Sequence, residues 1–349
     1  MASYSRDIEL LKEIIEMHLH IKKQFVARLL RNAEENPDAV TNPVRSLDDL
    51  YAFLNYFLTA MPWMGLEYGE GIKSNSSNKS LFYRIDQSIG YVYYIFGELQ
   101  FEPEIAEWLK LYHRHWAEYL DSTDSWNDEY YELAKSDPIF ELNGEKYESS
   151  DNWHTWNEFF ARRLSTSVRP PQIAEGQTFP WLSISGNTLD LKTAKIGNVS
   201  DLLGDSPYKE HFENGLFTHI TLDIYNYHRF HSPVDGKIID IQEIDGILSD
   251  GGKIIWDVEL EKYRYELQEN IGFQMIEKRT AIMISLSPAP NCENRMLAII
   301  PIGVAQVGSI LISEDIKIGG NVIKGQELGH FLFGGSDVVV ITNNKIGLE

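Results

Sequence analysis

The stretch FTHITLDIYNYHRFHSPVDGKIIDIQEIDG, residues 217–246, decides the fold of the second half of the chain. Two β-branched runs within it, Phe217–Leu222 and Lys237–Ile241, flank a segment rich in tyrosine and histidine. A glycine turn at Asp235-Gly236 directly precedes the second run, and another follows it at Asp245-Gly246. Short β-branched runs bounded by such turns are typical of antiparallel strands. The stretch therefore predicts two strands joined by an irregular segment.

The same pattern continues through the second half of the chain, from about Phe179 to Ile341. Further glycine turns occur at Gly251-Gly252 and Gly319-Gly320. Four more β-branched runs are Thr280–Leu286, Leu297–Val304, Ser309–Ile312 and Val338–Ile341. This spacing predicts an antiparallel sandwich or barrel-like body.

The first half of the chain has helical periodicity instead. Apolar residues recur every three to four positions from Ile8 to Leu30, and two prolines in residues 36–46 end this run. Ser46 and Asp49 form a candidate capping box for a second helix that reaches Phe57. Further helices are expected at Gln87–Leu99, Pro103–Leu120 and Asn152–Leu164, with a connecting region over residues 121–150. We therefore predict an α+β fold, with a helical N-terminal region at 1–150 and a β-rich domain at 151–349.

Composition and charge exclude several functions. The chain has 31 Lys and Arg against 52 Asp and Glu, a formal net charge of −21 that disfavours nucleic acids and anionic membranes as partners. Its single cysteine, Cys292, excludes an internal disulfide and a multi-cysteine metal site. The start of the sequence has no signal-peptide pattern. The most apolar segment, Tyr51–Leu66, is expected to be a buried helix, with a membrane-touching amphipathic helix as the alternative. We expect a soluble, cytoplasmic protein.

Two histidines in the opening stretch, His228 and His231, are candidates for acid–base chemistry, because imidazole titrates near neutral pH. Side chains three residues apart face opposite sides of a regular strand, so a shared site requires irregular backbone. Pro233 and Gly236 are compatible with such a backbone. The alternative is that one histidine only packs in the core.

A serine near the end of the sequence, Ser336, follows two glycines, Gly334 and Gly335. Glycines allow backbone conformations that are closed to other residues, so the hydroxyl could attack the preceding carbonyl. The alternative is a glycine bulge with an inert serine. A third segment, Trp156–Leu164 followed by Arg169-Pro170, is by itself an amphipathic helix with a solvated basic face.

In this order and at this separation, the three segments resemble the phosphatidylserine decarboxylase family. Its members share an FF-x-R-x-L…RP element, a YHRFHSPVDG element and a G-x-x-V-x-KGxELGxFxFG(G)S element, the last of which is here Gly319–Ser336. The resemblance covers roughly residues 156–341. The helical first half is similar to the soluble branch, which includes amino-acid decarboxylases such as fungal tryptophan decarboxylase.

The resemblance implies self-cleavage between Gly335 and Ser336 by an N-to-O acyl shift, which Gly334 and Gly335 would admit. Ser336 would then become a pyruvoyl group that condenses with a substrate amine, with no pyridoxal phosphate or metal. By family position, His228 would assist self-cleavage and His231 would serve decarboxylation.

The implied function is a soluble decarboxylase of an L-amino acid or a similar small amine-bearing acid. The alternatives are a decarboxylase acting on phosphatidylserine in lipid, and an unprocessed scaffold or binding protein. The sequence leaves the oligomeric state open.

This chain departs from the family pattern at three positions. Ser185 stands where the family has an aspartate after Arg-Pro, Asn226 replaces the aspartate before Tyr-His, and Asp337 replaces the usual Thr or Ser. If a carboxylate orients His228, the candidates are Asp190 and Asp223. Other polar residues, namely His18, His20, His113, His115 and Cys292, are expected to be surface, packing or incidental residues.

Overall fold

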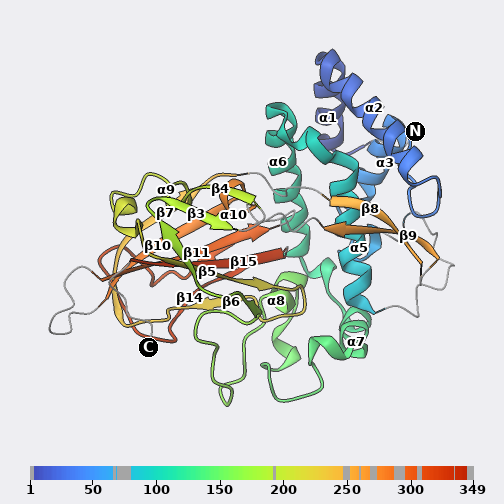
Figure 1. Cartoon of the computed structure of the whole chain (residues 1–349). Coiled ribbons are helices and arrows are strands. Elements are labelled where there is room, and N and C mark those ends of the chain that lie inside the picture. Colours follow the sequence, from blue (N-terminus) through green and yellow to red (C-terminus); the bar gives the residue numbers. More distant parts are fainter. Residues whose placement is uncertain are drawn as a thin grey trace. The chain divides into compact units, whose positions relative to one another are not determined.

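The computed structural model describes residues 4–65, 68, 80–191, 194–246, 252–258, 261–267, 273–286, 295–304, 309–333 and 335–343. The chain forms two compact units. The helical unit consists of Met1–Ile139 and Ser249–Gln268, and the β-rich unit consists of Phe140–Leu248 and Glu269–Glu349. The predicted order of helices first and a β-rich part after them is confirmed (Figure 1). The boundary between residues 150 and 151 stays a prediction.

The helical unit contains six described α-helices. They are α1 (Arg6–Met17), α2 (Leu19–Glu35), α3 (Leu47–Phe57), α5 (Leu81–Phe96), α6 (Pro103–Leu120) and α7 (Asp128–Ser136). The helical run predicted from Ile8 to Leu30 is divided at His18, whose backbone (φ −110°, ψ 89°) leaves the helical region. The predicted helix Pro103–Leu120 is confirmed, with the proline in its first turn.

The ends of α3 and α5 follow local chemistry. Ser46 caps α3, because its hydroxyl accepts the backbone N–H of Asp49 at 3.1 Å. Within the segment Tyr51–Leu66, residues 51, 53, 54, 57, 60–63 and 65 are buried as predicted, but the helix α3 ends at Phe57. The predicted helix Gln87–Leu99 starts earlier, at Leu81, and ends at Phe96. It ends there because Gly97 adopts a positive φ of 49° and the chain continues as the 3₁₀ segment η2 (Gly97–Phe101).

A β-hairpin from far along the sequence completes the helical unit. It consists of β8 (Gly252–Asp257) and β9 (Lys262–Leu267). The side chain of Gln87 on α5 donates to the Tyr265 carbonyl at 2.9 Å and accepts the Tyr265 N–H at 2.8 Å. A Cβ at Gly90 would lie 1.8 Å from the Tyr265 ring, so only glycine allows this close approach.

The region between the last long helix and the sheet is more structured than the predicted connection at residues 121–150. It contains α7 and the 3₁₀ segments η3 (Thr123–Ser125), η4 (Pro138–Phe140) and η5 (Ser150–Asn152). The helix predicted at Asn152–Leu164 is wrong in length, because only α8 (Trp156–Phe160) forms. Thr155 and Glu158 make the capping box at its start.

A ten-stranded antiparallel sheet forms the body of the β-rich unit. The order is β13-β7-β10-β11-β15-β5-β2-β3-β4, and β1 also pairs with β5. The strands are β1 (Gln177–Thr178), β2 (Leu182–Ser185), β3 (Thr188–Leu191), β4 (Ala194–Asn198), β5 (Leu216–Leu222), β7 (Gly236–Ile244), β10 (Arg279–Leu286), β11 (Met296–Val304), β13 (Asn321–Val322) and β15 (Gly335–Thr342). A second sheet has the order β12-β14-β6, from β12 (Ile310–Ile312), β14 (Glu327–Phe331) and β6 (Arg229–His231). The predicted antiparallel, barrel-like body is confirmed.

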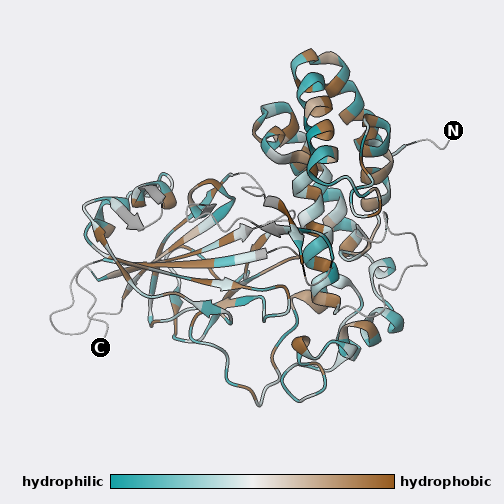
Figure 2. Cartoon of the chain, turned by 45° about the vertical axis from the view of Figure 1, so that its right-hand side comes forward, coloured by the Kyte–Doolittle hydropathy of each residue, from teal (hydrophilic) through white to brown (hydrophobic). Residues whose placement is uncertain are grey.

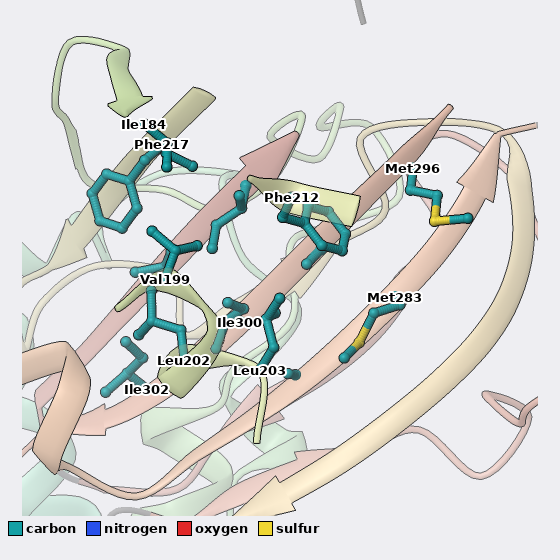
Figure 3. Close-up of a cluster of buried hydrophobic side chains, with 14 residues drawn as sticks. Ile184, Val199, Leu202, Leu203, Phe212, Phe217, Met283, Met296, Ile300 and Ile302 are labelled. Carbon is teal, nitrogen blue, oxygen red and sulfur yellow. The ribbon is translucent and has the colours of Figure 1, made fainter. Parts of the chain in front are cut away.

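Two short helices, α9 (Val199–Leu202) and α10 (Phe273–Ile276), and the 3₁₀ segment η6 (Lys209–Phe212) complete the β-rich unit. Apolar residues of α9 and η6 pack on one face of the large sheet (Figure 3). The cluster consists of Ile184, Val199, Leu202, Leu203, Phe212, Phe217, Ala281, Met283, Met296, Ala298, Ile300, Ile302, Val339 and Ile341. The alternation of strand side chains places Val339 and Ile341 of β15 on this face.

The hydropathy of the residues differs between the strands and the helices. Hydrophobic residues gather on the long strands, and the helices carry both hydrophobic and hydrophilic positions (Figure 2). Within the described parts of the chain, no helix is both long and apolar enough to cross a bilayer.

Candidate active site

The small sheet brings two of the predicted segments together. Strand β6 carries His231 and pairs antiparallel with β14, in the register Glu327↔His231 and His330↔Arg229. The backbone N–H of Phe331 also donates to the His228 carbonyl at 2.9 Å. Because β14 is followed along the chain by β15, this pairing places the start of β15, which contains Ser336, close to His228.

Ser336 lies beside His228, and both are buried. The Ser336 Oγ and the His228 Nδ1 are 2.9 Å apart, while the other ring nitrogen of His228, Nε2, lies 3.2 Å from the carbonyl oxygen of Ile224. A carbonyl oxygen can only accept a hydrogen bond, so Nε2 carries the ring proton and donates a hydrogen bond to the Ile224 carbonyl. In the neutral ring Nδ1 is then the acceptor, and the Ser336 hydroxyl donates to it. This is the arrangement of a general base next to its nucleophile.

The surroundings keep His228 neutral. Burial lowers the pKa of His228 to about 3, and the nearby Arg162 guanidinium acts in the same direction. The ring of Phe160 stacks on the imidazole with centroids 3.8 Å apart, which excludes water from that side. A neutral imidazole at physiological pH has its Nδ1 lone pair free to accept the proton of Ser336.

His231 has different partners. Its Nδ1 donates to the Gly325 carbonyl at 3.0 Å, and its Nε2 accepts from the Tyr227 hydroxyl at 3.0 Å. Burial lowers the pKa of His231 and raises that of Tyr227, so both groups are neutral near pH 7. The structure therefore joins His228 to Ser336, and it gives His231 a separate hydrogen-bond pair with Tyr227.

Two residues directly after α8, Ala161 and Arg162, hold the histidine segment in place. Arg162 is completely buried, and its Nη2 donates to the carbonyl of Tyr225 at 2.6 Å and to that of Asn226 at 3.4 Å. The guanidinium of Arg229 donates from Nε to the Ala161 carbonyl at 2.8 Å. The predicted solvated basic face is thus wrong for Arg162, because the chain turns after Phe160 and directs this side chain inward.

Further contacts fix the same segment from its other side. The N–H of Tyr227 donates to the Glu175 carboxylate at 2.9 Å, and the N–H of His231 donates to the Ile173 carbonyl at 2.7 Å. Arg229 also pairs with Glu327 of β14 at 2.6 Å. The irregular backbone that the two histidines require is therefore held by side chains from three parts of the β-rich unit.

The sequence model of the phosphatidylserine decarboxylase family matches residues 156–348, more than half of the chain. The chain belongs to this family. Phosphatidylserine decarboxylases are carboxy-lyases that use a pyruvoyl group derived from a serine. The resemblance expected from the three motifs is thus confirmed at the level of the family.

Curated relatives in this family differ widely in length. The chain is 32% identical over 203 residues to phosphatidylserine decarboxylase proenzyme 2 of Oryza sativa, covering 55% of this chain and 30% of that protein. It is 26% identical to the proenzymes of Fusobacterium nucleatum and Geobacillus kaustophilus, covering 63% and 72% of them and 57% and 58% of this chain. The chain thus spans less than a third of the rice relative and less than two thirds of the Fusobacterium relative. These relatives do not support the expected amino-acid-decarboxylase branch.

The residues at position 336 fit a pyruvoyl group of the kind that phosphatidylserine decarboxylases use. The Ser336 hydroxyl is hydrogen-bonded to the neutral base His228, and the residue is 1% exposed. The preceding residue, Gly335, has no side chain that could hinder attack on its carbonyl. Gly334, the other glycine expected to allow the acyl shift, lies outside the described residues. Among the residues that the structure describes, no group of three His, Cys, Asp or Glu side chains could hold a metal ion.

The three departures from the pattern of phosphatidylserine decarboxylases have distinct surroundings. Ser185 is exposed on β2. Asn226 closes a turn, since its side-chain oxygen accepts the Asp223 N–H at 2.7 Å. Asp337 is completely buried. Its carboxylate accepts from His219 Nδ1 at 3.0 Å and from Gln274 Nε2 at 2.9 Å.

The carboxylates expected near His228 have other surroundings. Asp223 accepts a hydrogen bond from the Tyr225 hydroxyl at 2.8 Å, and His228 Nε2 donates to the Ile224 carbonyl. The backbone of Asp190 lies in β3, and its side chain is outside the described part of the structure. The sequence also missed His219, although the alternation along Phe217–Leu222 places it on the same face as Phe217.

The remaining polar candidates lie away from this site in the sequence and have their own surroundings. His115 Nδ1 is 2.6 Å from the Asp7 carboxylate, and His18 and His20 are near Glu104 and Glu102. His113 is buried, as a packing residue would be. Cys292 lies outside the described residues.

Proposed function

We propose that this chain cleaves itself between Gly335 and Ser336 and then acts as a pyruvoyl-dependent phosphatidylserine decarboxylase. The observation that carries the proposal is the 2.9 Å hydrogen bond between the Ser336 hydroxyl and Nδ1 of a buried, neutral His228. A serine hydroxyl needs a base to become a nucleophile, and this base is already in its accepting form. Membership of the family supports the reaction class.

In the proposed cleavage, His228 Nδ1 takes the hydroxyl proton while Ser336 Oγ attacks the carbonyl carbon of Gly335. The C–N bond between the two residues breaks, the nitrogen of Ser336 leaves with the proton from His228, and an ester joins Gly335 to Ser336 Oγ. Loss of the Cα proton of residue 336 then expels the Gly335 carboxylate and leaves dehydroalanine. Water replaces the nitrogen, which departs as ammonia, and residue 336 becomes the pyruvoyl group.

The pyruvoyl group supplies an electron sink for the loss of CO₂ from an amine-bearing acid. The proposed role of His231 is to hold and move a proton at Nε2, the nitrogen that the Tyr227 hydroxyl already contacts. The bond from Nδ1 to the Gly325 carbonyl fixes the ring orientation and its tautomer. Tyr227 is thus the proposed group from which His231 recovers a proton.

Phosphatidylserine is the proposed substrate because the curated relatives carry that name. A free L-amino acid is the second candidate, favoured by the net charge of −21, which disfavours anionic lipid surfaces. The third candidate is an unprocessed binding protein, suggested by the replacements at Ser185, Asn226 and Asp337. The cytoplasmic location expected from the sequence stays a prediction.

The test compares the wild-type chain with Ser336→Ala and with Ser183→Ala, a control at an exposed serine on β2. Under denaturing conditions, the wild type and the control should release a fragment that begins at residue 336. Its mass, measured by mass spectrometry, should be lower than that of the serine-initiated peptide by one ammonia. Ser336→Ala should stay intact, because alanine has no hydroxyl. Turnover by Ser336→Ala would refute the pyruvoyl mechanism.

Release of CO₂ from phosphatidylserine in mixed micelles, and from a panel of L-amino acids, identifies the substrate. Activity on the micelles alone supports the proposal. Activity on a free amino acid alone replaces the lipid with the second candidate. An intact wild-type chain without any decarboxylation favours the binding protein.

A further inference from the structure

A buried carboxylate stands directly after the proposed cleavage site. Asp337 is 0% exposed, and a carboxylate in such a place is costly unless donors surround it. His219 Nδ1 lies 3.0 and 3.3 Å from its two oxygens, and Gln274 Nε2 lies 2.9 Å from one of them. These partners come from β5 and α10, so the Asp337 side chain ties β15 to two other elements.

Ser336 and Asp337 face opposite sides of the large sheet, because successive side chains of a strand alternate. Ser336 faces His228, while Asp337 shares the face of Val339 and Ile341, which belong to the apolar cluster in Figure 3. The contacts of Asp337 are therefore separate from the reacting atoms. They act on residue 336 only through the backbone.

Cleavage before residue 336 would separate Gly335, the first residue of β15, from the rest of the strand, which would then start as a free chain end at its reacting residue. In the intact chain, Gly335 pairs with Val304, and Ser336 pairs with Gly303 on β11 and with Leu222 on β5. Chain ends fray more readily than strand interiors. Once the covalent link to Gly335 is lost, the first side-chain anchor of the new chain is that of Asp337.

We propose that Asp337, bound by His219 and Gln274, is a positioning residue that holds residue 336 against His228 after the bond to Gly335 is broken. This inference rests on the proposed self-cleavage and extends it to the mature enzyme. Asparagine at this position would weaken the anchor, because it lacks the negative charge that strengthens the hydrogen bonds from both donors to the carboxylate.

The other end of the same strand provides a matched control. The Asn343 side chain accepts the Met296 N–H at 3.3 Å, and the Asn343 N–H donates to the Met296 carbonyl at 3.2 Å. This contact anchors β15 as well, at the end far from residue 336. The variant Asn343→Ala removes the hydrogen bond that the Asn343 side chain accepts. It therefore reports the effect of a less stable β15 alone, without a displacement of residue 336.

The experiment measures cleavage, kcat per cleaved chain, KM and hydrogen exchange of the peptide covering residues 336–343. Asp337→Asn should still cleave, and its KM should be unchanged. Its kcat should be on the order of 10- to 100-fold lower, because displacing a reacting group by about 1 Å lowers the rate of the chemical step by up to about that factor. Asn343→Ala should keep the wild-type kcat. Exchange near residue 337 should rise for Asp337→Asn in the cleaved enzyme, and it should not rise when Asp337→Asn is combined with the uncleavable Ser336→Ala.

Three outcomes overturn the inference or its basis. A wild-type kcat in cleaved Asp337→Asn, or an equal rise of exchange in the cleaved and uncleaved backgrounds, would make Asp337 a core residue only. A wild-type chain that neither cleaves nor decarboxylates would refute the proposed function itself. If Asp337→Asn does not fold, Gln274→Met carries the same test, since it removes one donor and leaves the carboxylate and His219 in place.

Discussion

Replacing His228 by glutamine tests the proposed base directly. Glutamine has a similar size, but it cannot take the hydroxyl proton that His228 Nδ1 accepts from Ser336 at 2.9 Å. Loss of a positioned base typically slows a reaction by ~10²–10⁴-fold, which corresponds to about 3–5 kcal/mol in the activation free energy. We therefore expect the cleavage rate of His228→Gln to fall by that factor.

The assay follows cleavage of freshly translated chain on denaturing gels over time. His211→Gln is the matched control, because His211 is exposed on η6 whereas His228 is buried beside Ser336. The control should cleave at the wild-type rate. Cleavage of His228→Gln at the wild-type rate would show that the hydrogen bond to Ser336 is structural and would refute the base assignment.

The pH dependence of the same cleavage gives a second, independent readout. A proton on Nδ1 would compete with the Ser336 hydroxyl, so only neutral His228 is active. With its pKa lowered to about 3, His228 is neutral throughout pH 5–8, and the cleavage rate should not fall over this range through titration of the base. An ordinary histidine with a pKa of about 6.5 would lose most of its neutral form by pH 5.5. A rate that halves near pH 6.5 would contradict the reasoning.

Three further changes test neighbouring features. Arg162→Met removes the guanidinium that binds the Tyr225 carbonyl, so urea denaturation should show a loss of about 2–4 kcal/mol in unfolding free energy. His231→Ala should cleave normally but release CO₂ ~10²–10⁴-fold more slowly per cleaved chain, as expected for loss of a proton-transfer group. Burial lowers the pKa of His113 to about 3, so the folded state resists its protonation and the wild type loses stability as pH falls below 6.5 towards 3. His113→Leu should reduce that loss when urea denaturation at pH 4.5 is compared with pH 7.5.

The strands were predictable because their sequence signal is local. Phe217–Leu222 and Val338–Ile341 are β-branched runs, and they lie in β5 and β15 within a few residues of the predicted limits. The helix break at His18 was not predictable in the same way, because neither glycine nor proline marks it. The short α8 also differs from its amphipathic pattern, since Arg162 is used to bind backbone carbonyls of another segment.

The site was predictable only as a set of residues. His228 and Ser336 were expected to act together, but their contact depends on the register of β6 with β14, which no local pattern specifies. The group that fixes the tautomer of His228 could not be predicted from the sequence, because it is a backbone carbonyl, that of Ile224, while the role suggested for Asp190 stays a prediction. Asp337 was visible only as a departure, and its meaning depends on His219 and Gln274, which are distant in sequence.

The hairpin β8–β9 has a consequence for how the protein is made. It belongs to the helical unit, yet it follows the whole first stretch of the β-rich unit, Phe140–Leu248, along the chain. During synthesis, α5 leaves the ribosome long before Tyr265, so the partner of Gln87 and Gly90 arrives only after much of the sheet has emerged. The helical unit therefore cannot reach its final packing as an early, independent folding step. Its completion is tied to a segment that the ribosome delivers late.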